Sequence, residues 1–201
     1  MNLPNKLTIV RMILIVPIIV LFSIFTWYVI TFENGEFKNV NLQISSQYFL
    51  YTIGIIFIIS MITDFLDGYF ARKNNQITVF GKLFDPLADK ITITITLIFL
   101  SYFQYTYIYI VIFMIIRDLI VDGSRNIFAK NNLKIEASIY GKLKTIFQSV
   151  AIPIILFLIP IVDSNVWWQL LMINIPMIIA LFLSIYSGYQ YFKQVIPFLK
   201  G

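Results

Sequence analysis

Cysteine and histidine are both absent from the 201 residues of this chain, and only 12% of the residues are charged. Without cysteine there is no disulfide, no thiolate metal site and no cysteine nucleophile. Without histidine, a general base must be Asp, Glu, Lys or Tyr, and a hard-metal site must use oxygen ligands. A soluble domain usually has about 25% charged residues. The chain has too little polar surface for a water-soluble globule, so we expect the bilayer to be its solvent.

Long apolar runs take the place of the missing charge, and 59% of the residues are hydrophobic. A membrane-spanning helix needs ~20 apolar residues. The stretches without any charged residue are 12–32, 39–63, 91–116, 145–162 and 164–192. The third contains the polar and aromatic sequence Ser-Tyr-Phe-Gln-Tyr-Thr at 101–106, which is typical of a turn at a membrane interface. We therefore expect two helices joined at 101–106, and six spans in total.

The basic residues divide unequally between the two sides of this six-span arrangement. Of the 15 Lys and Arg residues, all except Lys38 fall on the side that holds the two chain ends. By the positive-inside rule this side is the cytoplasm. The sequence therefore predicts an all-α integral membrane protein with six transmembrane helices, both termini cytoplasmic, forming one domain over residues 1–201. We expect no nucleic-acid partner.

Four aspartates, two glycines and an arginine follow helical spacing within residues 64–89. They form one stripe at i, i+3, i+4, i+8 and a second at i, i+4, i+8. The first stripe comprises Asp64, Asp67, Gly68 and Arg72, and the second comprises Gly81, Asp85 and Asp89. The polar link 72–80 is expected to be a short cytoplasmic turn between antiparallel helices. The four carboxylates should then converge near the cytoplasmic ends of the second and third helices.

Such a cluster needs compensating positive charge, because four close carboxylates repel one another near a bilayer. Two divalent cations would supply it, and oxygen-only ligation favours Mg²⁺ or Mn²⁺. Two metals a few Å apart suit a displacement at phosphorus, where they clamp the attacking and leaving oxygens. A glycine on each stripe lets a bulky ligand lie against the backbone, and Arg72 offers a bidentate contact to phosphate.

Two other interpretations compete with a phosphoryl-transfer centre. A single aspartate near a helix end is usually an interfacial cap or a solvated charge, but four at helical spacing with interleaved glycines are not explained in this way. A transporter or channel also uses intramembrane carboxylates. Its acids would be expected near the membrane midplane on broken helices, whereas these lie at the ends of the predicted spans.

The full pattern, Asp-x-x-Asp-Gly-x-x-Ala-Arg, eight residues, Gly-x-x-x-Asp-x-x-x-Asp, resembles the signature of the CDP-alcohol phosphatidyltransferases, and every signature position is met. The resemblance implies a six-helix membrane fold, a homodimer, a cytosol-facing site and two divalent cations. The implied metal ligands are Asp64, Asp67, Asp85 and Asp89. Gly68, Arg72 and Gly81 would cradle the CDP group. Asp89, the last acid on its stripe, is the expected general base.

Three further stretches, 2–11, 117–125 and 141–145, resemble the phosphatidylglycerophosphate synthases within that family. Asp118 departs from that pattern, since Glu is more frequent there. Predicted helices four and five carry cations at their cytoplasmic ends, where a phosphorylated acceptor requires them. The candidate acceptor-phosphate ligands are Arg117, Arg125, Lys142 and Lys144. Other juxtamembrane cations, such as Lys130 and Lys134, are expected to serve topology or anionic headgroups.

These observations predict an enzyme of the bacterial plasma membrane that moves a phosphatidyl group from CDP-diacylglycerol to glycerol 3-phosphate, giving phosphatidylglycerol phosphate and CMP. The active site should face the cytoplasm. One alternative is a sister enzyme whose acceptor is inositol phosphate or a second phosphatidylglycerol. A non-enzymatic alternative is a cation carrier.

Overall fold

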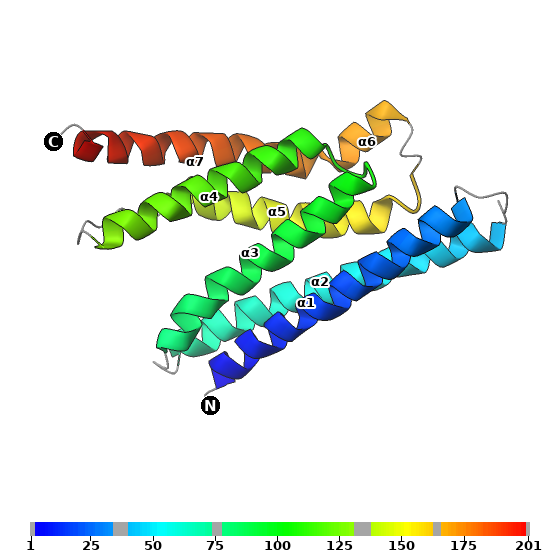
Figure 1. The fold of residues 1–201 in the computed structure, drawn as a ribbon, viewed down its shortest axis with the longest axis horizontal. Helices are drawn as coiled ribbons and strands as arrows, with labels where there is room; N and C mark the ends of the chain where they lie inside the picture. The colour runs from blue at the N-terminus through cyan, green and yellow to red at the C-terminus, as the bar shows by residue number, and fades with distance from the viewer. Residues whose placement is uncertain (1–2, 34–39, 74–77, 131–137, 163–165, 200–201) are drawn as a thin grey trace. The chain divides into compact units, whose positions relative to one another are not determined.

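The computed structural model describes residues 3–33, 40–73, 78–130, 138–162 and 166–199, and every regular element in these ranges is helical (Figure 1). The elements are α1 (Leu3–Tyr28), a short π-helical turn η1 (Val29–Glu33), α2 (Val40–Lys73), α3 (Val79–Tyr102), α4 (Ile108–Lys130), α5 (Ile139–Leu158), α6 (Trp167–Ile173) and α7 (Ile175–Leu199). They belong to two compact units. The first contains residues 1–99 and 156–162, and the second contains 100–155 and 163–201.

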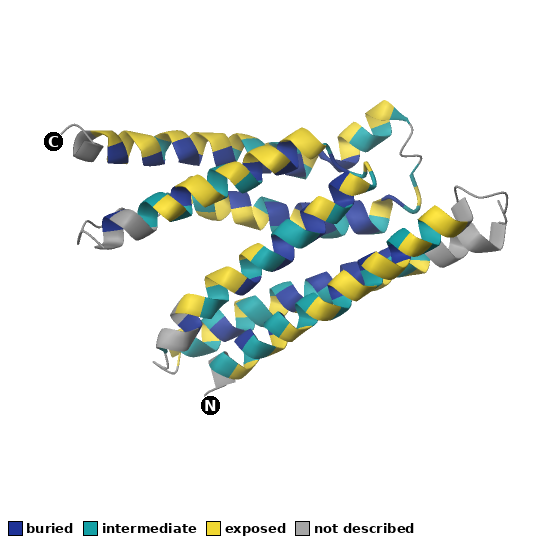
Figure 2. Cartoon of the chain, viewed as in Figure 1, coloured by how far each residue is buried: buried dark blue, intermediate teal, exposed yellow. Residues whose placement is uncertain are grey.

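Within the described residues, four helical segments are long and apolar enough to cross a membrane: Asn5–Thr31, Gln47–Lys73, Ile139–Leu158 and Ile175–Ile196. Only 28% of the most apolar part of each of the first two is buried within the protein, and Figure 2 shows exposed residues along the length of α1. Large apolar side chains such as Ile13 and Val16 are more than half exposed. A soluble protein does not expose apolar surface on this scale. The protein is therefore a helical membrane protein, and the count of six spans stays a prediction.

In the first unit α1 packs along α2 (Figure 1). Buried side chains at helical spacing, Ile18, Phe22 and Phe25, form the α1 side of this core. The Phe22 ring stacks on Phe99 of α3, with ring centroids 4.3 Å apart. This packing brings the N-terminal part of α1 beside the start of α3 and the end of α2, where the predicted site residues lie.

The predicted break at 101–106 is confirmed, because α3 ends at Tyr102 and α4 begins at Ile108. Gln104 has a φ of 59°, in the left-handed region. The Tyr105 amide donates to the Leu100 carbonyl at 2.9 Å, and the Gln104 amide donates to the Ser101 carbonyl at 3.1 Å. This pair of bonds is the Schellman arrangement that ends many helices. One charge-free stretch therefore yields two helices.

A second break lies in the charge-free stretch 164–192, which was predicted from the sequence as one span. It forms two helices, α6 and α7, separated at Asn174. Pro176 has no amide hydrogen to continue the ladder of α6, and proline is well tolerated in the first turn of the next helix. The buried Asn174 side chain donates to the Tyr105 carbonyl at 3.0 Å and accepts from the Thr106 hydroxyl at 2.6 Å. It thereby holds this break against the 101–106 turn within the second unit.

Candidate active site

The two predicted stripes lie on the last turns of α2 and the first turns of α3. α2 runs to Lys73, further than the sequence predicted, with Arg72 and Lys73 in its last turn, where positive charge is favoured by the helix dipole. Thr78 immediately precedes α3, and its Oγ1 accepts a hydrogen bond from the Gly81 amide at 3.0 Å. This is the bond that an N-cap residue makes. Residues 74–77 of the predicted link lie outside the described residues.

Arg11 of α1 is the centre on which three of the four aspartates converge. Its side chain is completely buried. Nη1 lies 2.6 Å from Asp64 Oδ1 and also contacts Asp89 Oδ1, while Nη2 contacts Asp67 Oδ2. One guanidinium therefore joins carboxylates from α2 and α3. From the sequence, Arg11 was assigned only to topology and to a stretch that carries a family resemblance.

The fourth aspartate, Asp85, also has its partner on α1. The Thr8 hydroxyl donates to Asp85 Oδ1 at 2.6 Å, and Thr8 is buried. The side chains of Asp64 and Asp89 keep 39% and 31% of their surface exposed, whereas Asp67 keeps 3%. The cluster is thus anchored on its α1 side and remains reachable from solvent at Asp64 and Asp89.

The donor set of this cluster suits a hard divalent cation. All four side chains supply carboxylate oxygens, which are the ligands that Mg²⁺ and Mn²⁺ prefer. The other three aspartates all act electrostatically on Asp67, and a single guanidinium offsets only part of their charge. As placed in the described ranges, no three acidic side chains are spaced to hold an ion, and three of the carboxylates contact Arg11. The chemistry and the residual charge fit a divalent cation.

The two motif glycines differ in what surrounds them. A Cβ at Gly81 would lie 3.1 Å from Asp85 Oδ2 and 3.4 Å from Thr78 Oγ1. A side chain there would therefore press on one acid of the cluster and on the cap of α3. A Cβ at Gly68 would have the atoms of the Arg72 guanidinium as its nearest neighbours, at 3.6–3.9 Å. The exposed Arg72 side chain thus folds back over Gly68 at the end of α2.

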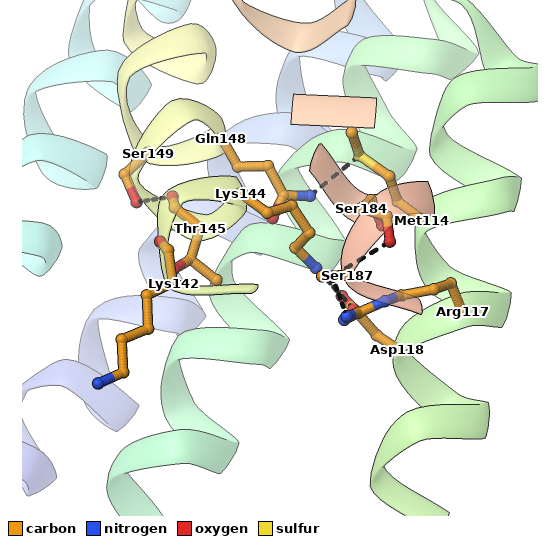
Figure 3. Close-up of polar contacts among 10 residues, drawn as sticks. All are labelled: Met114, Arg117, Asp118, Lys142, Lys144, Thr145, Gln148, Ser149, Ser184 and Ser187. Atoms are coloured by element: carbon orange, nitrogen blue, oxygen red, sulfur yellow. Dashed lines mark hydrogen bonds and ion pairs between the residues drawn. The ribbon is translucent and has the colours of Figure 1, made fainter. Parts of the chain in front are cut away.

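The second unit holds a separate group of polar side chains on α4, α5 and α7 (Figure 3). Lys144 is 2% exposed, and its Nζ lies 2.5 and 2.6 Å from the two carboxylate oxygens of Asp118. Arg117 Nη1 lies 2.9 Å from Asp118 Oδ1, and Nη2 contacts the Ser187 hydroxyl. Two of the predicted acceptor ligands, Arg117 and Lys144, are therefore brought together by one carboxylate.

The other two predicted acceptor ligands lie apart from this group. Lys142 is exposed, and Figure 3 shows its side chain directed away from Asp118. Arg125 is two helical turns beyond Arg117 on α4, and its guanidinium lies over the Tyr191 ring of α7, 5.9 Å from the centroid. This is the geometry of a cation–π contact.

Comparison with known proteins identifies the family of this chain. Residues 1–186 match the family model for CDP-alcohol phosphatidyltransferase. The chain belongs to the CDP-alcohol phosphatidyltransferase family.

Similar proteins within the family come from several bacteria. The Rickettsia typhi protein is 33% identical over 192 residues, 96% of each chain. The Bacillus subtilis protein is 33% identical over 202 residues, 96% of this chain and 94% of its own. The Mycoplasma pneumoniae protein is 34% identical over 209 residues, 99% of this chain and 89% of its own. All three are named CDP-diacylglycerol–glycerol-3-phosphate 3-phosphatidyltransferase.

As a CDP-alcohol phosphatidyltransferase, the protein is an enzyme of phospholipid synthesis from a family that generally depends on divalent cations. The sequence did not indicate the contacts of Thr8 and Arg11 with the aspartates, or that Asp118 pairs with Lys144. A signal for Arg11 was present: an ionisable residue that directly precedes a long apolar run is costly to keep near the bilayer and often functional.

Proposed function

We propose that this CDP-alcohol phosphatidyltransferase moves the phosphatidyl group of CDP-diacylglycerol to sn-glycerol 3-phosphate, giving phosphatidylglycerol phosphate and CMP. The observation that carries the proposal is the convergence of Asp64, Asp67 and Asp89 on one point at the meeting helix ends. It occurs in a chain whose relatives are named for this reaction.

The four aspartates, Asp64, Asp67, Asp85 and Asp89, would hold two divalent cations, Mg²⁺ or Mn²⁺. Bound cations would neutralise charge on the pyrophosphate and on the departing CMP. In the proposed site Gly68, Arg72 and Gly81 hold the CDP group. Arg72 suits this role, because its exposed guanidinium stands at the end of α2, over Gly68.

Asp89 is the proposed general base. Its carboxylate is 31% exposed, so an acceptor hydroxyl can approach it. The acceptor oxygen attacks the phosphorus that bears diacylglycerol and forms the new P–O bond. The bond from this phosphorus to the bridging oxygen breaks, CMP leaves with the electron pair, and the hydroxyl proton passes to Asp89. Arg11 holds Asp89 in place for this step.

Glycerol 3-phosphate is the proposed acceptor because of the cations in the second unit. Arg117 and Lys144 are held next to each other by Asp118, and the buried Arg117 Nε has no hydrogen-bond partner among the described residues. Two adjacent cations bind a phosphate dianion better than they bind an uncharged alcohol. Arg125 and Lys142 complete the proposed set at a greater distance from Asp118.

An acceptor panel tests the proposed reaction. The full chain, purified in detergent with phospholipid, is given labelled CDP-diacylglycerol, Mn²⁺ and one acceptor: glycerol 3-phosphate, inositol phosphate, phosphatidylglycerol or glycerol. We expect label in a new lipid, with release of CMP, only with glycerol 3-phosphate. Transfer to another acceptor would assign a sister enzyme. No transfer, together with Mn²⁺ uptake into vesicles that contain the protein, would support a carrier.

The proposed topology has six spans, cytoplasmic termini and a cytoplasm-facing site in the bacterial plasma membrane. The chain has no cysteine, so single cysteines report without background. Lys73→Cys, at the end of α2, should be shielded from an impermeant thiol reagent in intact cells. Tyr109→Cys, 82% exposed near the start of α4, should be labelled. Labelling of the Lys73→Cys variant from outside would place the site on the opposite face.

The family resemblance also implies a homodimer, which we include in the proposal. The expected result is a dimer mass for the protein in lipid nanodiscs, measured by light scattering with the lipid contribution subtracted. A monomer mass that persists at all protein-to-lipid ratios would exclude an obligate dimer. A monomer mass would not affect the proposed reaction, because the acceptor panel measures transfer separately.

A further inference from the structure

Three polar side chains follow one another at three-residue intervals at the start of α1: Asn5, Thr8 and Arg11. Positions spaced in this way share one side of a helix. Asn5 Oδ1 accepts a hydrogen bond from the Thr78 hydroxyl at 2.6 Å. Together with the contacts of Thr8 and Arg11, this places the whole polar stripe against the start of α3 and the end of α2.

The contacts advance in the same order along both helices. Asn5 meets the cap of α3, Thr8 meets Asp85 in its second turn, and Arg11 meets Asp89 one turn later. Arg11 also reaches across to the two aspartates of α2. Each acid of the cluster therefore has an α1 partner, although the three α1 residues lie outside the family signature motif.

Burial makes these contacts energetically demanding. Arg11 and Thr8 are 0% and 1% exposed, while their neighbour Val10 is 44% exposed. Removing a guanidinium from water costs several kcal/mol unless paired acceptors compensate. The polar side of α1 thus faces the carboxylates and its apolar side faces outward. A counter-charge for topology alone does not require this burial.

We infer that Asn5, Thr8 and Arg11 are positioning residues that act as a template for the four aspartates. This inference rests on the proposed function, because it concerns how the proposed metal ligands are oriented. Unrestrained, four carboxylates move apart by repulsion. The planar guanidinium of Arg11 ties α2 to α3, Thr8 fixes the rotamer of Asp85, and Asn5 fixes the start of α3 through Thr78. These contacts would keep the four carboxylates gathered beside α1 before a cation binds.

The template and a simple counter-charge predict opposite changes in Mn²⁺ affinity when Arg11 is removed. If Arg11 only occupied the cation's place, its removal would strengthen Mn²⁺ binding, because a nearby positive charge would be lost. If it positions the ligands, its removal weakens Mn²⁺ binding. Thr8 is neutral, so the Thr8→Val variant separates positioning from charge altogether.

The test titrates the purified full-length protein with Mn²⁺ alone and follows free Mn²⁺ by electron paramagnetic resonance, without substrates. Loss of a group that orients a ligand typically lowers metal affinity roughly 10- to 100-fold. We expect that loss for Thr8→Val and for Arg11→Gln. Thr8→Ser keeps the hydroxyl and should restore near-wild-type binding. Lys6→Gln, which removes an exposed charge from the same part of α1, should bind as the wild type does.

Hydrogen exchange in EDTA provides a second measurement that needs no metal. The amides of residues 81–89 should exchange faster in Thr8→Val and Arg11→Gln than in the wild type and Lys6→Gln. Unchanged affinity in Thr8→Val, or tighter Mn²⁺ binding by Arg11→Gln, would overturn the template. A wild-type protein that binds no Mn²⁺ would refute the proposed metal site, and the exchange result would still decide whether α1 orders the start of α3.

Discussion

An Asp85→Asn variant is expected to insert and fold normally and to lose phosphatidyl transfer by at least about a hundredfold. Loss of one preorganised electrostatic group in an active site commonly costs 10²–10³ in rate. Asparagine keeps the shape of the side chain, and its amide oxygen can still accept the bond from Thr8 that Asp85 accepts. The substitution therefore isolates the charge. Labelled CDP-diacylglycerol with saturating glycerol 3-phosphate measures the rate, and helix content measured by circular dichroism checks the fold.

Asp64→Asn should also lose phosphatidyl transfer while the protein stays folded. Asp64 is the most exposed of the three acids around Arg11, so its replacement should disturb the packing least. Asp122→Asn on α4 is the matched control, since it removes an acid that lies outside the proposed site. EDTA should stop the wild-type reaction, and added Mn²⁺ should restore it. Activity that survives exhaustive chelation would reject the divalent cation, and equal losses in the control would reject a specific role for the cluster.

A Lys144→Gln variant should bind glycerol 3-phosphate more weakly and leave the apparent affinity for CDP-diacylglycerol nearly unchanged. A lost charge-assisted hydrogen bond costs ~1.5–3 kcal/mol, which corresponds to roughly a ten- to hundredfold loss of apparent affinity for the acceptor. Asp118 keeps its contact with Arg117 in this variant, so the half-buried carboxylate is not left without a cation. The measurement is the acceptor concentration dependence of the rate at saturating lipid substrate.

The geometry also predicts an order among the four candidate acceptor ligands. Arg117→Gln should match Lys144→Gln, because both cations contact Asp118. Lys142→Ala and Arg125→Gln should have smaller effects, since both side chains lie apart from that pair. Lys193→Ala, an exposed cation on α7, is the control. Equal effects in all five variants would show that these cations only set topology, and glycerol 3-phosphate would lose its physical support as the acceptor.

Local features of this protein follow from its sequence because they depend on neighbours in the chain. Charge-free runs predicted its helices, and the polar run 101–106 predicted the break between α3 and α4 correctly. The spacing of Asp64 and Asp67, and of Asp85 and Asp89, placed each pair on one side of a helix. The absence of charge across 164–192 does not predict the break at Asn174, although Pro176 carries a signal for it.

Tertiary packing alone decided which groups compensate the charged side chains. Arg11 is 56 residues from Asp67 and 78 from Asp89, and Thr8 is 77 from Asp85. Asp118 likewise takes up Lys144, 26 residues away. Helical periodicity states which residues share a face, but it does not state which helix that face meets. Burial of a charge is tolerated only where packing supplies a partner, and those partners come from other helices. The acids of the site are therefore readable from the sequence, whereas the contacts that α1 makes with them are not.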